Sequence, residues 1–197
     1  MKKPEDVNIT KSWMREWGES LIIALVLALL IRTFVVQAFK IPSGSMIQTF
    51  KIGDRIFVNK FLYGARIPFT DIRLPAVRQP VRGDVIVFVS AETPKKDFVK
   101  RLIALGGERV EIRDRRIYVN GSVVDEPSSI RSVDYYNAGD YGKEGEAVIV
   151  PADSYFALGD NSASSRDSRY WGFVPKKNLI GKVICVYWPL HRIKAVK

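Results

Sequence analysis

The sequence predicts a mainly β protein, with a largely antiparallel β domain behind one N-terminal transmembrane helix. Two observations predict this fold: one long apolar segment near the N-terminus and, after residue 39, several short segments rich in β-branched and aromatic residues. The chain has 197 residues, of which 47% are hydrophobic and 26% are charged. These values are typical of globular proteins and exclude disordered, collagen-like and low-complexity classes.

The apolar segment begins with eleven consecutive apolar residues over 21–31 and continues, after a short polar break, to residue 39. As a helix, residues 21–39 would be about 28 Å long, enough for a hydrocarbon core of roughly 30 Å. Trp13 and Trp17 lie one turn apart just before it, where indole rings anchor at a headgroup layer. We therefore expect an N-terminal segment over 1–20 and a transmembrane anchor over 21–39.

Two other interpretations of this segment stay open. A buried core helix would suit the short uninterrupted run, and Arg32 is costly in hydrocarbon unless it reaches an interface. A cleaved signal peptide would suit the small-x-small pattern Val36-Gln37-Ala38, although Arg32 separates that pattern from the apolar run. The 20 residues before the segment carry four Lys or Arg and the 20 after it carry three, so charge does not predict the orientation.

Residues 40–197 are predicted to form one largely antiparallel β domain. Asn120-Gly121 is the two-residue turn that matches the twist of antiparallel strands, so we expect a hairpin there. The sequence shows no alternation of strands with helices, which favours an antiparallel sheet. Residues 105–150 are expected to be a non-catalytic β insertion. The clearest strand-like segments cover residues 55–58, 84–88, 116–119 and 182–188.

Two loops are expected, over 63–83 and 125–146. The first, with its flanking residues, interleaves apolar side chains with Lys60, Arg66, Arg73 and Arg78. This mixture suits a surface that rests on anionic lipid, and it suits equally an ordinary loop whose apolar residues pack on the domain. The second loop is polar and has no apolar period, and we assign no chemistry to it.

Charge and rare residues limit the function further. The net charge is +10, which favours an anionic partner such as nucleic acid or a lipid surface, and no recognition-helix or RNA-binding signature supports nucleic acid. The single cysteine, Cys185, excludes an internal disulfide, and the single histidine, His191, excludes multi-histidine metal sites. We expect no metal and no cofactor.

Ser45 is the candidate nucleophile. Pro42 and Gly44 mark a turn that can expose Ser45 and aim its own N–H at a carbonyl group, and Ser43 supplies a second donor nearby. Ser45 also lies close behind the apolar segment, where it would meet substrates that are held in a membrane. The usual base for a serine is histidine, but His191 lies near the C-terminus and a Ser-His-Asp triad has little support.

Lys100 is the candidate base, because burial can lower the pKa of a lysine until it accepts a proton. The segment 97–104 reads as a strand, in which Lys100 alternates with Arg101. Both faces of the strand carry apolar residues, so the alternation of side chains does not predict which of the two cations is buried. Chemistry favours Lys100, since an arginine in a protein does not give up its proton.

Five stretches follow the N-terminal segment in a characteristic order, and together they resemble one family: the bacterial type I signal peptidases, or leader peptidases, which are membrane-anchored Ser/Lys proteases. The resemblance covers most of the chain and implies a β domain of the signal-peptidase type. The stretches are Pro42-Ser43-Gly44-Ser45-Met46, residues 53–60, residues 82–88, Lys100-Arg101-Leu102 with residues 106–110, and Gly159-Asp160-Asn161 with residues 167–172.

The resemblance implies roles for individual residues. Ser45 matches the nucleophile and Lys100 the general base. Ser43 matches the residue whose hydroxyl joins the Ser45 N–H in the oxyanion hole, and Ser165 matches the serine that orients the base. Ser164 stands where the family usually has Asn, which puts in doubt a hydrogen bond from that position. The implied structural ion pairs are Arg101 with Asp160 and Asp167 with Arg169.

The resemblance also implies the reaction and its setting: cleavage of signal peptides from exported preproteins after small residues, in an Ala-x-Ala pattern. It implies a single-pass protein of the bacterial inner (plasma) membrane, with the catalytic domain on the non-cytoplasmic side, near anionic lipid headgroups and possible secretion machinery. Small substrate side chains would enter shallow apolar pockets built from residues that flank the two catalytic positions, namely Phe39, Ile41, Met46, Val87, Phe98 and Val99.

Three alternatives compete with this interpretation. A self-cleaving Ser/Lys protease would share the chemistry, but the apolar segment occupies the place of the soluble DNA-binding region expected there. A membrane-associated basic β domain could bind its partner without catalysis. Cys185 as a nucleophile is the weakest, because its segment reads as a buried strand in which a thiol is inert.

Overall fold

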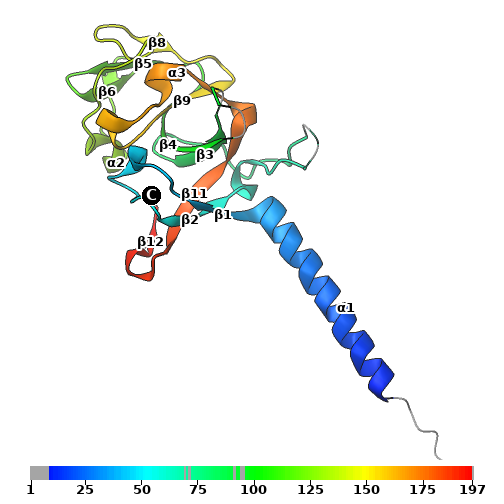
Figure 1. Ribbon diagram of the computed structural model, residues 1–197. Coiled ribbons are helices and arrows are strands. Elements are labelled where there is room, and N and C mark those ends of the chain that lie inside the picture. Colours follow the sequence, from blue (N-terminus) through cyan, green and yellow to red (C-terminus); the bar gives the residue numbers. More distant parts are fainter. Residues whose placement is uncertain (1–8, 69, 71, 91, 94–95, 197) are drawn as a thin grey trace, which may run out of the picture.

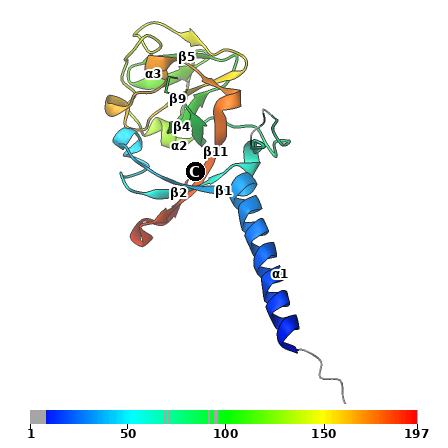
Figure 2. The same ribbon diagram turned by 45° about the vertical axis from the view of Figure 1, so that its right-hand side comes forward.

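The computed structural model describes residues 9–68, 70, 72–90, 92–93 and 96–196. One long helix projects from a β domain, and two views 45° apart show it leaving the domain without packing against it (Figures 1 and 2). Lys2 and Lys3, which entered the charge comparison, lie outside the described residues, and so does Phe69 of the first loop.

The helix begins earlier and ends earlier than the sequence predicted. The α-helix α1 covers Ile9–Leu30 and continues as a π-helix, η1, over Ile31–Val35. A stretch within it, Arg15–Val35, is long and apolar enough to cross a membrane, and none of its most apolar window is buried. The expectation of helix to residue 39 was wrong, because Val36–Lys40 forms strand β1 and pairs with β2.

The main sheet is antiparallel at every strand pair, as predicted. Its order is β1-β2-β11-β3-β4-β9-β10, and β12 pairs with β11. The four predicted strands are confirmed within β2, β3, β6 and β11. The strand bounds are β2 Arg55–Asn59, β3 Val85–Val89, β4 Asp97–Ala104, β9 Ser154–Leu158, β10 Val174–Pro175, β11 Leu179–Trp188 and β12 Lys194–Ala195.

A second sheet, of order β7-β6-β5-β8, lies within residues 105–150. The predicted hairpin is present: Asn120 and Gly121 have φ of 52° and 82°, the left-handed conformation that a two-residue turn of this kind requires. Two short helices follow, α2 (Ser128–Arg131) and α3 (Ser168–Trp171). The strand bounds are β5 Arg109–Arg113, β6 Arg116–Val119, β7 Ser122–Val123 and β8 Val148–Ile149.

Single helical turns complete the fold, and one of them, η2 over Gly44–Met46, carries Ser45. It lies on an apolar cluster that includes Phe50, Ile56 and Val183, all fully buried. The turn that carries Ser45 therefore stands on a packed part of the domain. The other turns are η3 Phe61–Tyr63, η4 Ser162–Ser164, η5 Lys176–Asn178 and η6 Leu190–Arg192.

The loop over 125–146 differs from its expectation as a purely polar insertion. Ile130, Val133 and Tyr135 are each at most 5% exposed and join the core between the second sheet and β9. Their irregular spacing has neither a helix nor a strand period. Periodicity therefore gave no signal for a segment that is nevertheless part of the core.

The loop over 63–83 uses two of its cations inside the domain. Arg73 donates to the carbonyl oxygens of Gly64 and Leu179, and Arg78 pairs with the buried carboxylate of Asp84. These two arginines stabilise the loop on the domain, which favours the second of the two alternatives, a loop packed on the domain.

Candidate active site

The turn that carries Ser45 follows the edge strand β1. Ser43 is extended, with φ −135° and ψ 162°, and the chain then enters the η2 turn. A distant segment holds this turn. Asn161 donates from its backbone N–H to the Ser45 carbonyl oxygen at 3.0 Å and from its side-chain amide to the Gly44 carbonyl oxygen at 2.9 Å. The Ser45 hydroxyl is thus presented on a turn whose backbone is positioned from outside.

Lys100 lies in β4, paired in register with Ile86 of β3, and its side chain is 4% exposed. Among the described residues, no hydrogen bond or ion pair holds its amine. An ammonium ion in this position has lost most of its contact with water, and no hydrogen bond within the described chain replaces that contact. This is the environment in which a lysine gives up its proton most readily.

Burial lowers the pKa of Lys100 from an ordinary value of 10.5 to about 8. The carboxylates of Asp167 and Asp160 oppose this change, and the Arg169 guanidinium adds to it. Desolvation is the largest of these effects, because the two carboxylates are themselves bound to arginines. Near pH 8 a large fraction of Lys100 is therefore neutral and able to act as a base.

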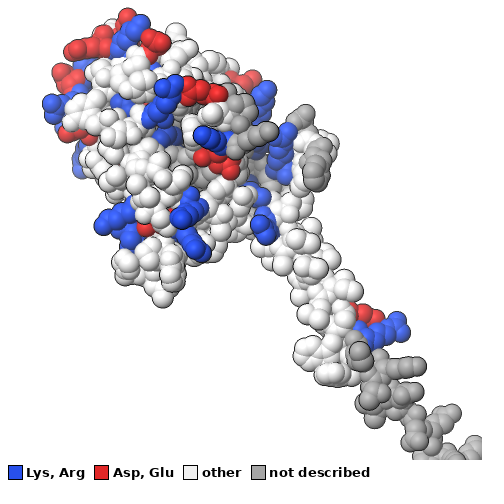
Figure 3. Space-filling view, in the orientation of Figure 1, with Lys and Arg blue, Asp and Glu red and all other residues white. Residues whose placement is uncertain are grey.

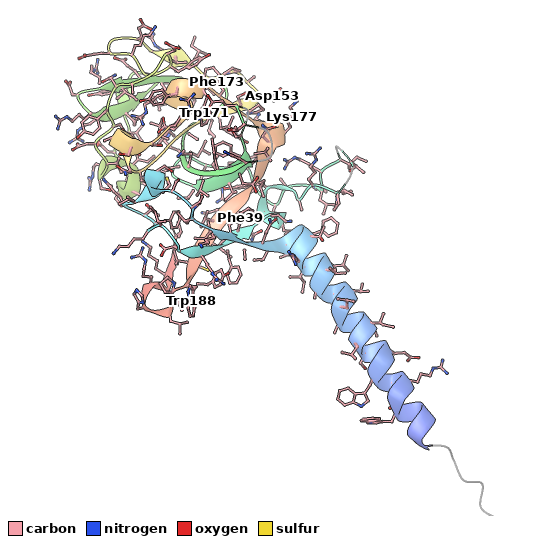
Figure 4. The ribbon with its side chains drawn as sticks, in the orientation of Figure 1. Phe39, Asp153, Trp171, Phe173, Lys177 and Trp188 are labelled. Atoms are coloured by element: carbon pink, nitrogen blue, oxygen red, sulfur yellow. The ribbon has the colours of Figure 1, made fainter. Side chains whose placement is uncertain are left out.

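Ser45 and Lys100 line one cleft of about 510 Å³. Its walls come from the segment 39–46 on one side and the segment 96–100 on the other, with Ser164 and Arg166 also at the cleft. Figure 4 places Phe39 on β1, beside the junction of the helix and the domain. Five of the six predicted pocket residues line the cleft: Phe39, Ile41, Met46, Phe98 and Val99.

Val87, the sixth predicted pocket residue, does not line the cleft. It is fully buried in the cluster on which the η2 turn rests, with Val99 packed against that cluster. Val87 pairs with Val99 across β3 and β4. The prediction was wrong because β4 lies between β3 and the cleft, so that Val87 supports the wall and does not form it.

Both walls of the cleft present a strand edge. β1 is the first strand of its sheet and pairs only with β2. β4 pairs with β3 along residues 97–101, whereas β9 pairs only with Arg101, Leu102 and Ala104. Within the described chain, residues 97–100 therefore have no strand on their second side. An extended peptide in the cleft could pair with either edge.

Ser165 is 5% exposed, and its hydroxyl has no hydrogen-bond partner among the described residues. Gly159 allows this hydroxyl to approach the turn that carries Ser45. A Cβ atom at Gly159 would lie 2.2 Å from Ser165 Oγ and 2.5 Å from the Ser45 carbonyl oxygen, closer than atoms can pack. Gly159 is thus a residue of the site whose individual role the sequence did not indicate.

Arg101, on the opposite face of β4 from Lys100, forms a buried ion pair with Asp160. Its Nε and Nη2 atoms donate to the two carboxylate oxygens at 2.8 and 2.7 Å. Arg101 also donates to the hydroxyl groups of Ser129, at 3.0 Å, and Thr49, at 3.1 Å. Ser129 belongs to α2, so the loop over 125–146 supports this pair, a contact that could not be read from the sequence.

Asp167 and Arg169 form the second buried ion pair, with Nε and Nη2 donating to the two carboxylate oxygens at 2.8 Å each. Asp167 also accepts a hydrogen bond from the Gly159 backbone N–H at 3.0 Å. Arg169 donates to the Ser165 carbonyl oxygen at 3.2 Å. The pair therefore holds the backbone on both sides of the Ser165 hydroxyl.

The other candidates lie outside the cleft. His191 is exposed on η6 and does not line the cleft with Ser45. Cys185 is half-buried on β11, which differs from the expected full burial, and it does not line the cleft either. In the part of the chain that the structure describes, no three His, Cys, Asp or Glu side chains gather in a way that could hold a metal ion.

Comparison with known proteins gives consistent matches. The family "Signal peptidase, peptidase S26" matches residues 14–188. The chain is 36% identical to a signal peptidase I of Pseudomonas aeruginosa, a match that covers 88% of this chain and 73% of that protein. It is 33% identical to a signal peptidase I of Bacillus amyloliquefaciens, over 92% of this chain and 89% of that protein.

One solved structure is also similar in sequence. A crystal structure of a signal peptidase I from Enterococcus faecalis is 35% identical, covers 54% of this chain and 98% of that chain, and superposes with a TM-score of 0.44.

Proposed function

Because this chain belongs to the signal peptidase family, peptidase S26, we propose that Ser45 and Lys100 are the nucleophile and the base of its reaction. The protein is a serine endopeptidase that cleaves signal peptides from preproteins. The observation that carries the assignment is the shared cleft: Ser45 and Lys100 line it together, and Lys100 is buried without a partner.

The proposed reaction begins with neutral Lys100. Its amine takes the proton of the Ser45 hydroxyl while Ser45 Oγ attacks the carbonyl carbon after the last residue of the signal peptide. The scissile C–N bond then breaks, and the Lys100 ammonium gives its proton to the leaving amine. Water, deprotonated by the same amine, attacks the carbonyl carbon of the acyl-enzyme ester. The bond between this carbon and Ser45 Oγ breaks, the Lys100 ammonium returns its proton to Oγ, and the signal peptide leaves with a free carboxyl group.

Ser43 and Ser165 support these steps in the proposal. The Ser43 hydroxyl and the Ser45 N–H donate to the oxyanion that develops, and each donor is worth about 3 kcal/mol of barrier. The Ser165 hydroxyl accepts from or donates to the Lys100 amine and orients it. Its burial without any other partner in the described chain supports this role.

The substrate would bind in the cleft as an extended strand between the free edges of β1 and residues 97–100. Successive side chains of a strand point to opposite faces, so the first and third residues before the cut would face the same apolar wall. That wall includes Ile41, Met46 and Val99, and we propose that its pockets are too small for larger side chains. Steric exclusion explains a preference for Ala better than attraction does, since one methylene changes binding by only about 1–3 kcal/mol.

The helix would anchor the protein in the bacterial inner (plasma) membrane. Its apolar stretch Arg15–Val35 has a mean hydropathy of 2.1, and the cleft is built on β1, which directly follows it. We propose that the domain lies on the non-cytoplasmic side, at the headgroup layer, where it can meet membrane-held signal peptides as they leave the secretion machinery.

A cleavage assay tests the assignment of Ser45 as the nucleophile. The purified full chain, in detergent, is given a preprotein with an Ala-x-Ala site. Ser45→Ala should abolish product formation, whereas Ser122→Ala, at an exposed position on β7, should leave the rate unchanged. Retention of helix and strand content by circular dichroism shows that the variants are folded. Substantial cleavage by folded Ser45→Ala protein would reject Ser45 as the nucleophile.

A further inference from the structure

Two cations lie together where the helix meets the domain. Arg32 belongs to the π-helix Ile31–Val35, and Lys60 directly follows β2. The Lys60 backbone N–H donates to the Val35 carbonyl oxygen at 2.9 Å, and its amine donates to Gln37 Oε1 at 3.2 Å. Lys60 is thus fixed at the end of the helix, one turn from Arg32. Figure 3 shows Lys and Arg side chains at this junction.

Neither cation is neutralised within the described part of the chain. No carboxylate pairs with Arg32 or Lys60, and the side-chain partner of Lys60 is a neutral amide. Partial burial, and after it the nearby charge of Arg32, lower the pKa of Lys60. Two like charges held close together destabilise each other unless an anion lies between them.

This arrangement differs from that of other basic residues nearby. Arg73 and Arg78 are satisfied by carbonyl oxygens and by Asp84. A cation at a helix C-terminus interacts favourably with the helix dipole, which accounts for Arg32. The dipole does not account for a second cation that is held beside the first by its own hydrogen bonds.

Exposed apolar side chains lie close to the pair along the chain. Ile31 and Val35 on the helix and Phe61 on η3 are 54%, 37% and 46% exposed. The pair therefore lies at the boundary between an apolar surface suited to acyl chains and a polar domain suited to headgroups.

We propose that Arg32 and Lys60 bind the phosphate diester of an anionic phospholipid, whose acyl chains lie along the exposed apolar side chains of the helix end. The inference rests on the proposed membrane anchoring. Binding at this junction would set the height of the domain, and with it the height of the cleft, above the hydrocarbon core.

Native mass spectrometry of the full chain tests the site. The protein is released from micelles that contain equal amounts of phosphatidylglycerol and phosphatidylcholine. The wild-type protein should retain phosphatidylglycerol over phosphatidylcholine by about tenfold or more. Arg32→Gln with Lys60→Gln should remove this preference. Lys176→Gln with Lys177→Gln makes the same change in charge on η5, away from the helix, and should keep the preference (Figure 4).

Equal retention of the two lipids by the wild-type protein, or an unchanged preference in the Arg32/Lys60 variant, would overturn the site. Displacement of phosphatidylglycerol by an equal concentration of glycerophosphate would also overturn it, because the site would then bind free phosphate and not a lipid.

Two further measurements separate this inference from the proposed function. Cleavage of a soluble peptide in detergent should be unchanged in the Arg32/Lys60 variant, so a loss of lipid preference is distinct from a loss of catalysis. Co-sedimentation of wild-type protein with phosphatidylcholine vesicles reports anchoring. If the protein does not co-sediment with these vesicles, both the membrane anchoring and the proposed lipid site are wrong. If it co-sediments but shows no preference for phosphatidylglycerol, only the proposed lipid site is wrong.

Discussion

The backbone N–H of Asn161 donates to the carbonyl oxygen of Ser45 at 3.0 Å, and this bond joins the turn of the proposed nucleophile to the segment that follows β9. The same segment supplies Gly159, which approaches Ser165, and Asp160, whose N–H lies 3.3 Å from the Met46 sulfur. The positions of Ser45, the proposed nucleophile, and of Ser165 are therefore coupled through three consecutive residues, 159–161.

Gly159→Ala should disrupt this coupling. The new methyl group would overlap both the Ser45 carbonyl oxygen and the Ser165 hydroxyl, so the turn that carries Ser45 and the Ser165 side chain must move apart. A misplacement of about 1 Å costs on the order of 100-fold in rate, and we expect at least this loss of kcat. Gly18→Ala, at a position on α1 with nothing within 4 Å, is the matched control and should keep wild-type kcat. Wild-type kcat in Gly159→Ala would show that the close approach is unimportant.

Lys100→Met should stabilise the protein while it abolishes cleavage. The pKa of Lys100 is lower in the folded state than in the unfolded state, so folding disfavours the charged amine. The resulting loss of folding stability is complete below about pH 8, where Lys100 is charged in both states. The difference between 10.5 and about 8 corresponds to about 3 kcal/mol at neutral pH. The wild type should regain this stability as pH rises from 8 to 10.5. Chemical denaturation at pH 7 measures the effect, and a lower stability of Lys100→Met would indicate that the charge is compensated.

The rate of cleavage should rise with pH through the pKa of Lys100. The base must be neutral, so kcat/KM of the wild type should increase tenfold per unit below about pH 8 and level off above it. His191→Ala should give the same profile, because His191 does not line the cleft. A rise centred near 10.5, or a profile that changes in His191→Ala, would contradict the assignment of the base.

Arg101→Met should destabilise the fold more than it changes the chemistry. It would leave the Asp160 carboxylate, 1% exposed, without its counter-charge, which typically costs about 3–5 kcal/mol. Arg116→Met breaks a pair whose side chains are 56% and 54% exposed and should cost under about 1 kcal/mol. Equal effects of the two variants in urea denaturation would show that the buried pair has no special structural role.

The fold could be predicted where local sequence determines it. The strands around Ile56, Ile86 and Ile117 and the Asn120-Gly121 turn follow from residue preferences over a few positions, and the structure confirms them. The end of the helix was predicted too late. Three of the four residues 36–39 are apolar and could continue the helix, and only pairing with the distant strand β2 makes them a strand.

The site could be predicted only in part. Ser45 and Lys100 were candidates because their chemistry is visible in the sequence, and the structure brings them into one cleft. The contacts of Arg101 join residues far apart in the chain, such as Ser129 and Asp160, and no local pattern predicts them. Gly159 could have been suspected, because a glycine directly after the buried strand β9 often marks a close approach of backbones.

The most direct test of the account is the ionisation of Lys100 itself. Heteronuclear NMR can measure the pKa of this one amine in Ser45→Ala protein that carries labelled lysine. The sample is titrated from pH 6 to 11. The Lys100 signal is assigned as the one that is missing from the double variant Ser45→Ala with Lys100→Met. The account predicts a value of about 8. A value near 10.5, the ordinary one for lysine, would contradict it, because Lys100 would then remain charged when Ser45 has to give up its proton.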